Sequence, residues 1–171
     1  MASRIHEDLS AYRWGFTLIE LIVVISILLL ISSGVIANYN NFNENQRVKQ
    51  LALTLKTNLR LAQTKALSGA KPLAPFLCAQ LESYTVTFSS SQYSVQATCA
   101  APDDGQGDIM TVSLPSGVTL STLPLTPVLE FYVLNQGTNL SSEVTIALTG
   151  LKNYAISVAP NGSISDLGIQ N

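Results

Sequence analysis

Glu20 is the side chain whose position most needs a chemical explanation. It is the one ionisable residue within the run 16–37, which is otherwise rich in Ile, Leu and Val. About 20 apolar residues suffice for a helix to cross a bilayer. A carboxylate in such a helix costs on the order of a few kcal/mol unless it is paired, and no Lys or Arg lies within a helical turn of it. One candidate partner is a free α-amino group, created if the chain is cut between Gly15 and Phe16.

Two simpler interpretations of the apolar run stay open. A cleaved secretory signal has a core of about 7–15 apolar residues followed by a small-residue cleavage site. The run 16–37 is longer than that, although Ser32, Ser33 and Gly34 could imitate such a site. A plain membrane anchor accounts for the length of the run but leaves Glu20 without a reason.

The stretch GFTLIELIVVISILL, residues 15–29, resembles the class III signal of type IV prepilins and type II secretion pseudopilins. This resemblance implies that a prepilin peptidase removes a leader, residues 1–15, and that the new N-terminal Phe16 is N-methylated. It also implies that Glu20 attracts the N-terminal amine of a neighbouring subunit during assembly. The expected partners are then the peptidase, other pilin or pseudopilin subunits, an inner-membrane assembly platform and, before assembly, membrane lipid.

Two features depart from the family pattern. The family often has a proline about twenty-two residues into the mature helix, where this chain has Ala37. The leader contains Glu7 and Asp8 and is therefore less basic than many leaders. Arg4 and Arg13 still favour a cytoplasmic N-terminus, which predicts a single-pass protein of the inner membrane with its head outside.

The segment 38–70 is predicted to continue the helix as an amphipathic half. Its start, the asparagine-rich stretch 37–46, suits either a pliable helix or a linker. Gly69 followed by Pro72 marks the end of the helix. One apolar stripe at helical spacing is expected to pack on a sheet: Val48, Leu51, Ala52, Leu55, Leu59, Ala62 and Ala66.

Residues 71–171 are predicted to form a β-rich head. Alternation over 83–99 on both sides of a polar turn predicts a hairpin, and 103–108 and 115–127 are predicted loops. The other expected strands are 109–114, 129–134, 144–148, 154–158 and 163–165. The expected fold class is α+β and type IV pilin-like, with a long N-terminal helix on an antiparallel sheet head.

Three further stretches resemble GspH/FimT-type minor pseudopilins. LALTLKTNLRLAQTKALSGAKP, residues 51–72, is similar to the helix end of that subfamily. LEFYVLNQGT, residues 129–138, and YAISVAPNGSI, residues 154–164, are similar to its closing strands, each followed by a glycine turn. The resemblance narrows the expectation to a minor pseudopilin of this type.

Cys78 and Cys99 are the only cysteines. With the head outside the cytoplasm a disulfide between them is allowed, and it would tie the first strands to the helix end. The alternative is a pair of reduced, buried cysteines. Two cysteines without nearby histidines make a poor zinc site.

Few residues of the chain are candidates for enzymatic catalysis. The single histidine, His6, lies in the leader, so no Ser-His-Asp or Cys-His arrangement is expected after processing. The loop 103–108, DDGQGD, offers oxygen ligands for calcium but lacks the EF-hand spacing, which favours a solvated acidic loop. No enzyme activity, cofactor or metal is therefore predicted.

The charge distribution distinguishes between the remaining candidate functions of the chain. Residues 38–71 carry six Lys and Arg against Glu44, a net +5, whereas residues 72–171 carry seven acids against Lys152, a net −6. An acidic head disfavours nucleic acid, which attracts clustered Lys and Arg. The leading prediction is a structural subunit of a type IV pilus or a type II secretion pseudopilus. The alternatives are a major pilin, a DNA-binding minor pilin and a membrane-tethered adhesin.

Overall fold

The structure is a computed structural model that describes residues 15–72, 78–100, 107–135 and 137–170, without the side chains of 33–41, 107–109 and 135. The predicted leader therefore lies outside the described residues, apart from Gly15. The chain divides into two compact units, Met1–Asn40 and Asn41–Asn171.

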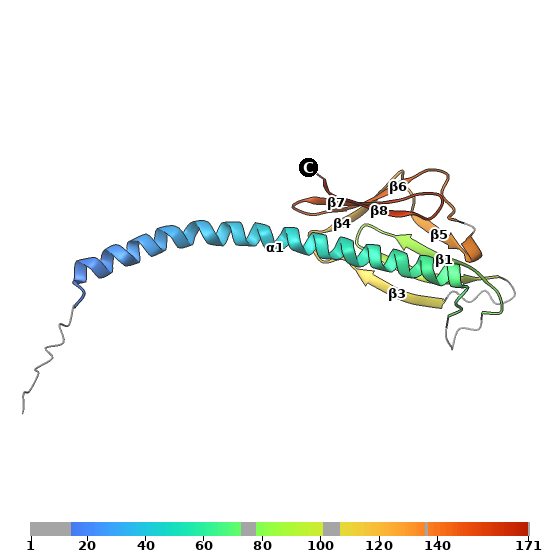
Figure 1. Ribbon diagram of the computed structural model, residues 1–171, viewed down its shortest axis with the longest axis horizontal. Coiled ribbons are helices and arrows are strands. Elements are labelled where there is room, and N and C mark those ends of the chain that lie inside the picture. Colours follow the sequence, from blue (N-terminus) through green and yellow to red (C-terminus); the bar gives the residue numbers. More distant parts are fainter. Residues whose placement is uncertain (1–14, 73–77, 101–106, 136, 171) are drawn as a thin grey trace, which may run out of the picture. The chain divides into compact units, whose positions relative to one another are not determined.

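One helix, α1 (Leu18–Ser68), occupies 51 residues and belongs to both units (Figure 1). It is helical throughout 37–46, so the linker interpretation of that stretch is wrong. The helix ends where Gly69 adopts a φ of 61°. The N–H groups of Gly69 and Ala70 then bond to the carbonyls of Ala66 and Lys65. This is a Schellman motif, which satisfies the last carbonyls of a helix and favours glycine at the left-handed position.

The rest of the described chain is mostly β-structure, as predicted. The hairpin expected at 83–99 is formed by the first two strands, and the last strand is longer than the expected 163–165. The strands of the described residues are β1 (Leu81–Phe88), β2 (Gln92–Cys99), β3 (Gly107–Ser113), β4 (Thr119–Leu123), β5 (Val128–Tyr132), β6 (Val144–Thr149), β7 (Asn153–Val158) and β8 (Ile164–Gln170).

The predicted loop 115–127 is wrong in its centre, because it contains β4. Leu120 and Thr122 are buried while their neighbours in the strand are exposed, the alternation of a half-buried strand. The prolines flank this short strand instead of interrupting it. Leu120 lies opposite Leu148 of β6, so its partner is provided by a distant part of the sequence.

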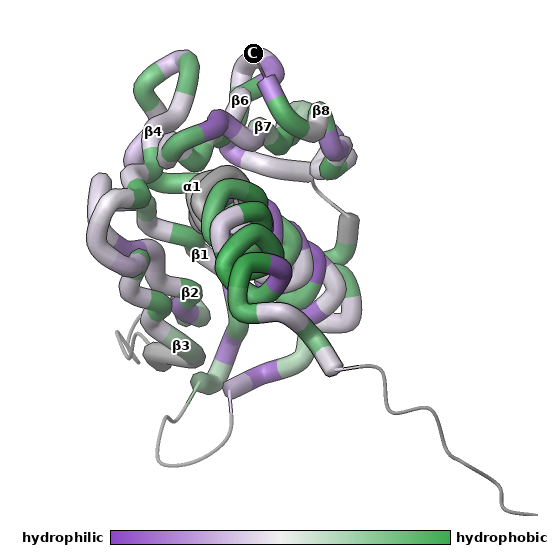
Figure 2. The backbone as a smooth tube through the Cα atoms, turned by 90° about the vertical axis from the view of Figure 1, so that its left-hand side faces the viewer, coloured by the Kyte–Doolittle hydropathy of each residue, from purple (hydrophilic) through white to green (hydrophobic). Residues whose placement is uncertain are grey.

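The strands form two four-stranded antiparallel sheets. The first has the order β3-β2-β1-β5 and the second the order β4-β6-β7-β8. The predicted α+β class with an antiparallel head is confirmed, with the head divided between two sheets. Figure 2 shows the strands of both sheets around the part of α1 that belongs to the second unit.

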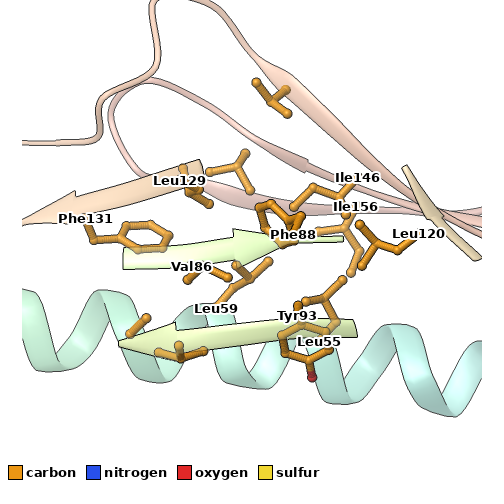
Figure 3. Packing of buried hydrophobic residues seen from close by; sticks show 14 of the residues in the cluster. Leu55, Leu59, Val86, Phe88, Tyr93, Leu120, Leu129, Phe131, Ile146 and Ile156 are labelled. Carbon is orange, nitrogen blue, oxygen red and sulfur yellow. The ribbon is translucent and has the colours of Figure 1, made fainter. Parts of the chain in front are cut away.

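A single hydrophobic core joins the helix to both sheets. From α1 it takes Val48, Ala52, Leu55, Leu59, Ala62 and Ala66, six residues of the predicted stripe. In Figure 3, Leu55 and Leu59 lie against Val86 and Tyr93 of the first sheet, and Phe88 lies near Ile146 and Ile156 of the second. Leu51, the seventh stripe residue, is partly buried against the same core.

Candidate processing and assembly sites

The predicted cleavage point lies just before the helix. Residues 15–17 are outside α1, and Phe16 is 83% exposed. A Cβ atom added to Gly15 would meet no atom within 4 Å, and its φ is not in the left-handed region. The described part of the fold therefore contains no packing or backbone reason for glycine at this position.

Glu20 lies in the first turn of α1, where the sequence T-x-x-E over 17–20 resembles a capping box. The Glu20 N–H donates to the Thr17 hydroxyl over 3.3 Å, and Thr17 is the residue before the helix. A carboxylate in the first turn also interacts favourably with the helix dipole. This capping arrangement was not predicted, although the spacing of Thr17 and Glu20 indicates it.

The first half of α1 is apolar around its whole circumference. Every large apolar side chain from Leu18 to Ile31 is between 47% and 77% exposed. Its serine hydroxyls bond within the helix, Ser26 to the Ile22 carbonyl at 2.8 Å and Ser32 to the Leu28 carbonyl at 2.7 Å. Such bonds satisfy hydroxyl groups without water, which suits a helix in an apolar environment.

The predicted transmembrane span 16–37 stays a prediction. In the described ranges we find no helix that combines the length and the apolar character needed to cross a membrane. The end of the expected span falls among residues 33–41, whose side chains lie outside the description.

The second half of α1 is held to the head by polar contacts as well as by the core. The Asn58 amide donates to the Tyr93 hydroxyl at 2.7 Å, and the Gln63 amide donates to the Gly162 carbonyl at 2.8 Å. At the C-terminal end of the helix the Tyr84 hydroxyl donates to the Ala70 carbonyl. These contacts fix the rotation of the helix about its axis, so its outward-facing residues are defined.

A three-residue polar network joins the helix to the last strand. The Lys56 ammonium donates to the Asp166 carboxylate at 2.9 Å, with side chains 18% and 28% exposed. This bond, aided by donation from Tyr154 and the Gly168 N–H, lowers the pKa of Asp166. Burial, together with the bond to Asp166, raises the pKa of Tyr154. Lys56 and Asp166 are 110 residues apart in the sequence, so the contact has no local signal.

Cys78 and Cys99 form the predicted disulfide, with Cα atoms 5.6 Å apart. Cys99 ends β2, and Cys78 lies shortly before β1. The bond therefore ties the entry of the first strand to the end of the second. The alternative of reduced cysteines is not what the structure contains.

The remaining candidate residues do not form a reactive cluster in the described chain. Residues 103–106 of the predicted acidic loop lie outside the described residues, as does His6. Among the residues that were described, no group of three or more His, Cys, Asp or Glu could hold a metal ion. The polar contacts found in the head connect the helix, strands and turns of the fold.

Comparison with known proteins gives one informative similarity. No model of a known family matches the chain, and no curated protein matches it. Among solved structures it is similar to the type IV minor pilin FimU of Pseudomonas aeruginosa, with a TM-score of 0.55 and 15% identity over 73% of this chain and 91% of that one. The chain has a type IV pilin fold. At this identity the similarity concerns the fold alone.

The pilin fold accounts for the arrangement of the head. The amphipathic half of α1 packs on antiparallel sheets, and the disulfide and polar contacts secure this packing. None of these contacts involves Gly15, Phe16 or the Glu20 carboxylate among the described residues.

Proposed function

We propose that the chain is a structural subunit of an extracytoplasmic filament, a type IV pilus or a type II secretion pseudopilus. A prepilin peptidase cuts between Gly15 and Phe16, and Phe16 is then N-methylated. Before assembly, the mature helix lies in the inner membrane, with the N-terminus on the cytoplasmic side and the head outside. It is then moved by the assembly platform into contact with other subunits.

The observation that carries this proposal is the apolar half of α1 in a chain with a pilin fold. Its leucine, isoleucine and valine side chains are exposed on every side. Exposed apolar surface of this extent marks an interaction with lipid or protein. Lipid before assembly and the helices of other subunits afterwards both satisfy that requirement, whereas a soluble monomer leaves the surface in water.

The proposal assigns Glu20 to assembly. Its carboxylate would pair with the methylated amine of Phe16 in a neighbouring subunit, and such a pair is stronger in an apolar environment than at a wet surface. The name of the similar structure, a minor pilin, favours a minor subunit over a major one. The finer assignment to the GspH/FimT type rests on the sequence resemblance.

Processing provides the test. The wild-type chain, produced together with a prepilin peptidase, is expected to begin at N-methylated Phe16, as read by mass spectrometry of its N-terminal peptide. Gly15→Val should leave the leader attached, because it puts a bulky side chain at the glycine after which the resemblance places the cut. Ala11→Val is the matched control in the leader and should be processed normally. A mature wild-type chain that begins elsewhere contradicts the proposal.

A further inference from the structure

The turn between β6 and β7 marks one end of the head. The Gly150 N–H donates to the Lys152 carbonyl over 3.3 Å, so Leu151 lies at the tip of a tight turn. A Cβ atom on Gly150 would lie 2.7 Å from a methyl carbon of Val48 and 3.9 Å from the Gly117 carbonyl oxygen. The turn therefore lies beside Val48, the first residue of α1 that belongs to the core of the head.

This end of the head exposes apolar side chains. Leu151 is 65% and Ile169 47% exposed. Ile169 lies opposite Tyr154, the second residue of β7, and β8 ends one residue later. The tip of the turn and the end of the adjoining strand therefore present apolar side chains to the surroundings of the head.

Two lysines accompany these apolar side chains. Lys152 follows Leu151 in the turn, and Lys49 follows Val48 in the helix. Both lysines are exposed, and neither forms a salt bridge with a described residue. We call Lys49, Leu151, Lys152 and Ile169 the Leu151 edge. Lysines beside exposed apolar side chains suit a membrane–water interface, where the stem of the lysine covers apolar surface and its ammonium stays in the polar layer.

Three of the described carboxylates of the head lie away from the Leu151 edge. Glu143 comes just before β6, at the end of that strand opposite the turn, so about 20 Å of strand separates them at about 3.3 Å per residue. Glu82 lies near the C-terminal end of α1, because the neighbouring Tyr84 donates its hydroxyl to the Ala70 carbonyl. Glu130 is on β5 of the first sheet, whereas the turn belongs to the second.

Two described acids that lie closer to the Leu151 edge are already paired. Glu44, one helical turn before Val48, forms an ion pair with Arg47 at 3.7 Å. Asp166, on β8, accepts from Lys56 at 2.9 Å. The Leu151 edge is therefore positively charged, although the sequence of the head as a whole is acidic.

We propose that the Leu151 edge contacts the surface of an anionic phospholipid bilayer before the subunit is assembled. The lysines would meet lipid phosphates, and Leu151 would enter the headgroup layer. Each lysine near an anionic surface strengthens binding about fivefold. A second copy of the chain is a poorer partner, because its described acids are on separate elements, whereas a bilayer combines surface charge with hydrocarbon beneath it.

The contact rests on the proposed filament function, which places the apolar half of α1 in the inner membrane. Val48 follows Ala37, the end of the apolar run, by 11 residues, so no more than about 17 Å of helix separates them. The headgroup layer is about 5–8 Å thick, and charge attraction extends about 8 Å further at physiological salt. The four-carbon stem of a lysine covers the remainder, so the lipid phosphates are within reach of the Leu151 edge.

Fluorescence quenching with the full chain in lipid vesicles tests the contact. The dye NBD is attached to the new thiol of Leu151→Cys or of the matched control Ser142→Cys, which is exposed at the opposite end of β6. Cys78 and Cys99 are bonded to each other, which leaves the introduced thiol to react. The vesicles contain phosphatidylglycerol and phosphatidylethanolamine, and the quencher is a lipid with a spin label on its headgroup.

The dye at position 151 should be quenched about threefold or more above the dye at position 142. In vesicles of phosphatidylcholine alone, quenching at position 151 should fall to the level at position 142. The contact is wrong if the two positions are quenched equally in the anionic vesicles. It is also wrong if the emission of the dye at position 151 shifts only at a high ratio of protein to lipid, without quenching by the headgroup label, because a second copy would then cover the edge.

Charge reversal provides the second arm. Lys49→Glu and Lys152→Glu should each lower the quenching at position 151 about threefold or more. Arg60→Glu is the matched control, because it reverses an exposed cation 12 residues beyond Val48 on the same helix, and it should leave the quenching unchanged. Equal quenching in all three variants and the unreversed chain would contradict the role of the two lysines and with it the proposed contact.

A dye in the apolar half of α1 separates this inference from the proposed function. Leu28→Cys carries the same dye, and the quencher is a spin label on the lipid acyl chains. If the dye at position 28 is quenched but the dye at position 151 is not, the contact is wrong and the membrane stage of the proposed function stands. If the dye at position 28 is not quenched, the membrane stage is wrong and the contact with it. Quenching at both positions in a chain that never enters sheared filaments would support the contact and contradict the filament function.

Discussion

The two halves of α1 meet opposite environments within one continuous helix. From Leu18 to Ile31 every large apolar side chain is about half exposed or more, whatever its position around the axis. From Val48 to Ala66 one stripe is buried, Leu51 partly and its other members almost completely, and the remaining residues are polar or exposed. The first half is apolar all round, and the second half is amphipathic.

This difference shows which part of the helix sequence is explained by packing within the chain. The second half is explained by contacts within its own unit, because its apolar residues pack on both sheets. In the first half, the apolar residues have no such cover among the described residues. Under the proposed function, lipid and then other subunits would cover these residues.

Truncation of a core leucine should have the largest effect on stability. Leu59→Ala leaves a cavity in the core, so we expect the free energy of unfolding of the head to fall by about 2–5 kcal/mol. Leu28→Ala, the matched change in the apolar half, should alter it by less than about 0.5 kcal/mol. Thermal unfolding of the full chain in detergent, followed by near-ultraviolet circular dichroism of its tyrosines, measures both. Equal losses of unfolding free energy in the two variants would contradict the difference between the two halves of α1.

Loss of the disulfide should come next. A cross-link over a separation of 21 residues restricts the unfolded chain and contributes about 3 kcal/mol on the chain-entropy model. The double variant Cys78→Ser and Cys99→Ser should lower the unfolding free energy by about that amount, measured by urea denaturation. The wild-type protein under reducing conditions is the control and should lose the same amount. A variant as stable as the oxidised wild type would contradict this role.

The Lys56–Asp166 pair should have the smallest effect, and one that depends on pH. The pKa of Asp166 is lowered in the fold, so its stabilisation is present above the unfolded value of about 3.9 and is lost as pH falls through the folded pKa. Lys56→Met should lower stability at pH 7 by about 1 kcal/mol. The variant should also lose less unfolding free energy than the wild type between pH 4 and pH 2, because the pKa of Asp166 is then closer to its usual value. Denaturation curves over this pH range that do not differ between the variant and wild type would exclude the linkage.

The sequence predicted the elements whose signals are local. The stripe from Val48 to Ala66 repeats every three or four residues, and the hairpin of β1 and β2 alternates on both sides of a polar turn. Gly69 predicted the end of the helix, because the left-handed conformation found there favours glycine. The disulfide was predictable because the chain has only two cysteines.

Features that depend on distant partners escaped prediction. Prolines on both sides of β4 favoured a loop there. The alternation of buried and exposed side chains in β4 depends on its pairing with β6. The division into two sheets has no local signature. Gly150 is another example: a Cβ atom there would lie 2.7 Å from a methyl carbon of Val48, a close approach that only the folded chain reveals. Thr17 was different, since its capping signal was visible and was overlooked.

The processing and assembly site stays a prediction that rests on a resemblance. Gly15, Phe16 and Glu20 were recognised by resemblance to a processing signal, and the fold gives them no other described role beyond the first turn of α1. Their proposed partners are a peptidase and other subunits. A single chain therefore cannot display the contacts that would explain these residues.

The charge of Glu20 tests the central claim, assembly through the apolar half of α1, most directly. Glu20→Gln keeps the size of the side chain, and the Thr17 cap uses the Glu20 backbone N–H, which the variant retains. We expect Glu20→Gln and Glu20→Ala to be processed and to accumulate in the membrane, because removing a carboxylate from an apolar helix eases insertion. The ratio of sheared-filament protein to membrane protein, measured against wild type, should fall about tenfold or more if the lost ion pair is in an apolar environment. A ratio that stays at the wild-type value for both variants would contradict the claim.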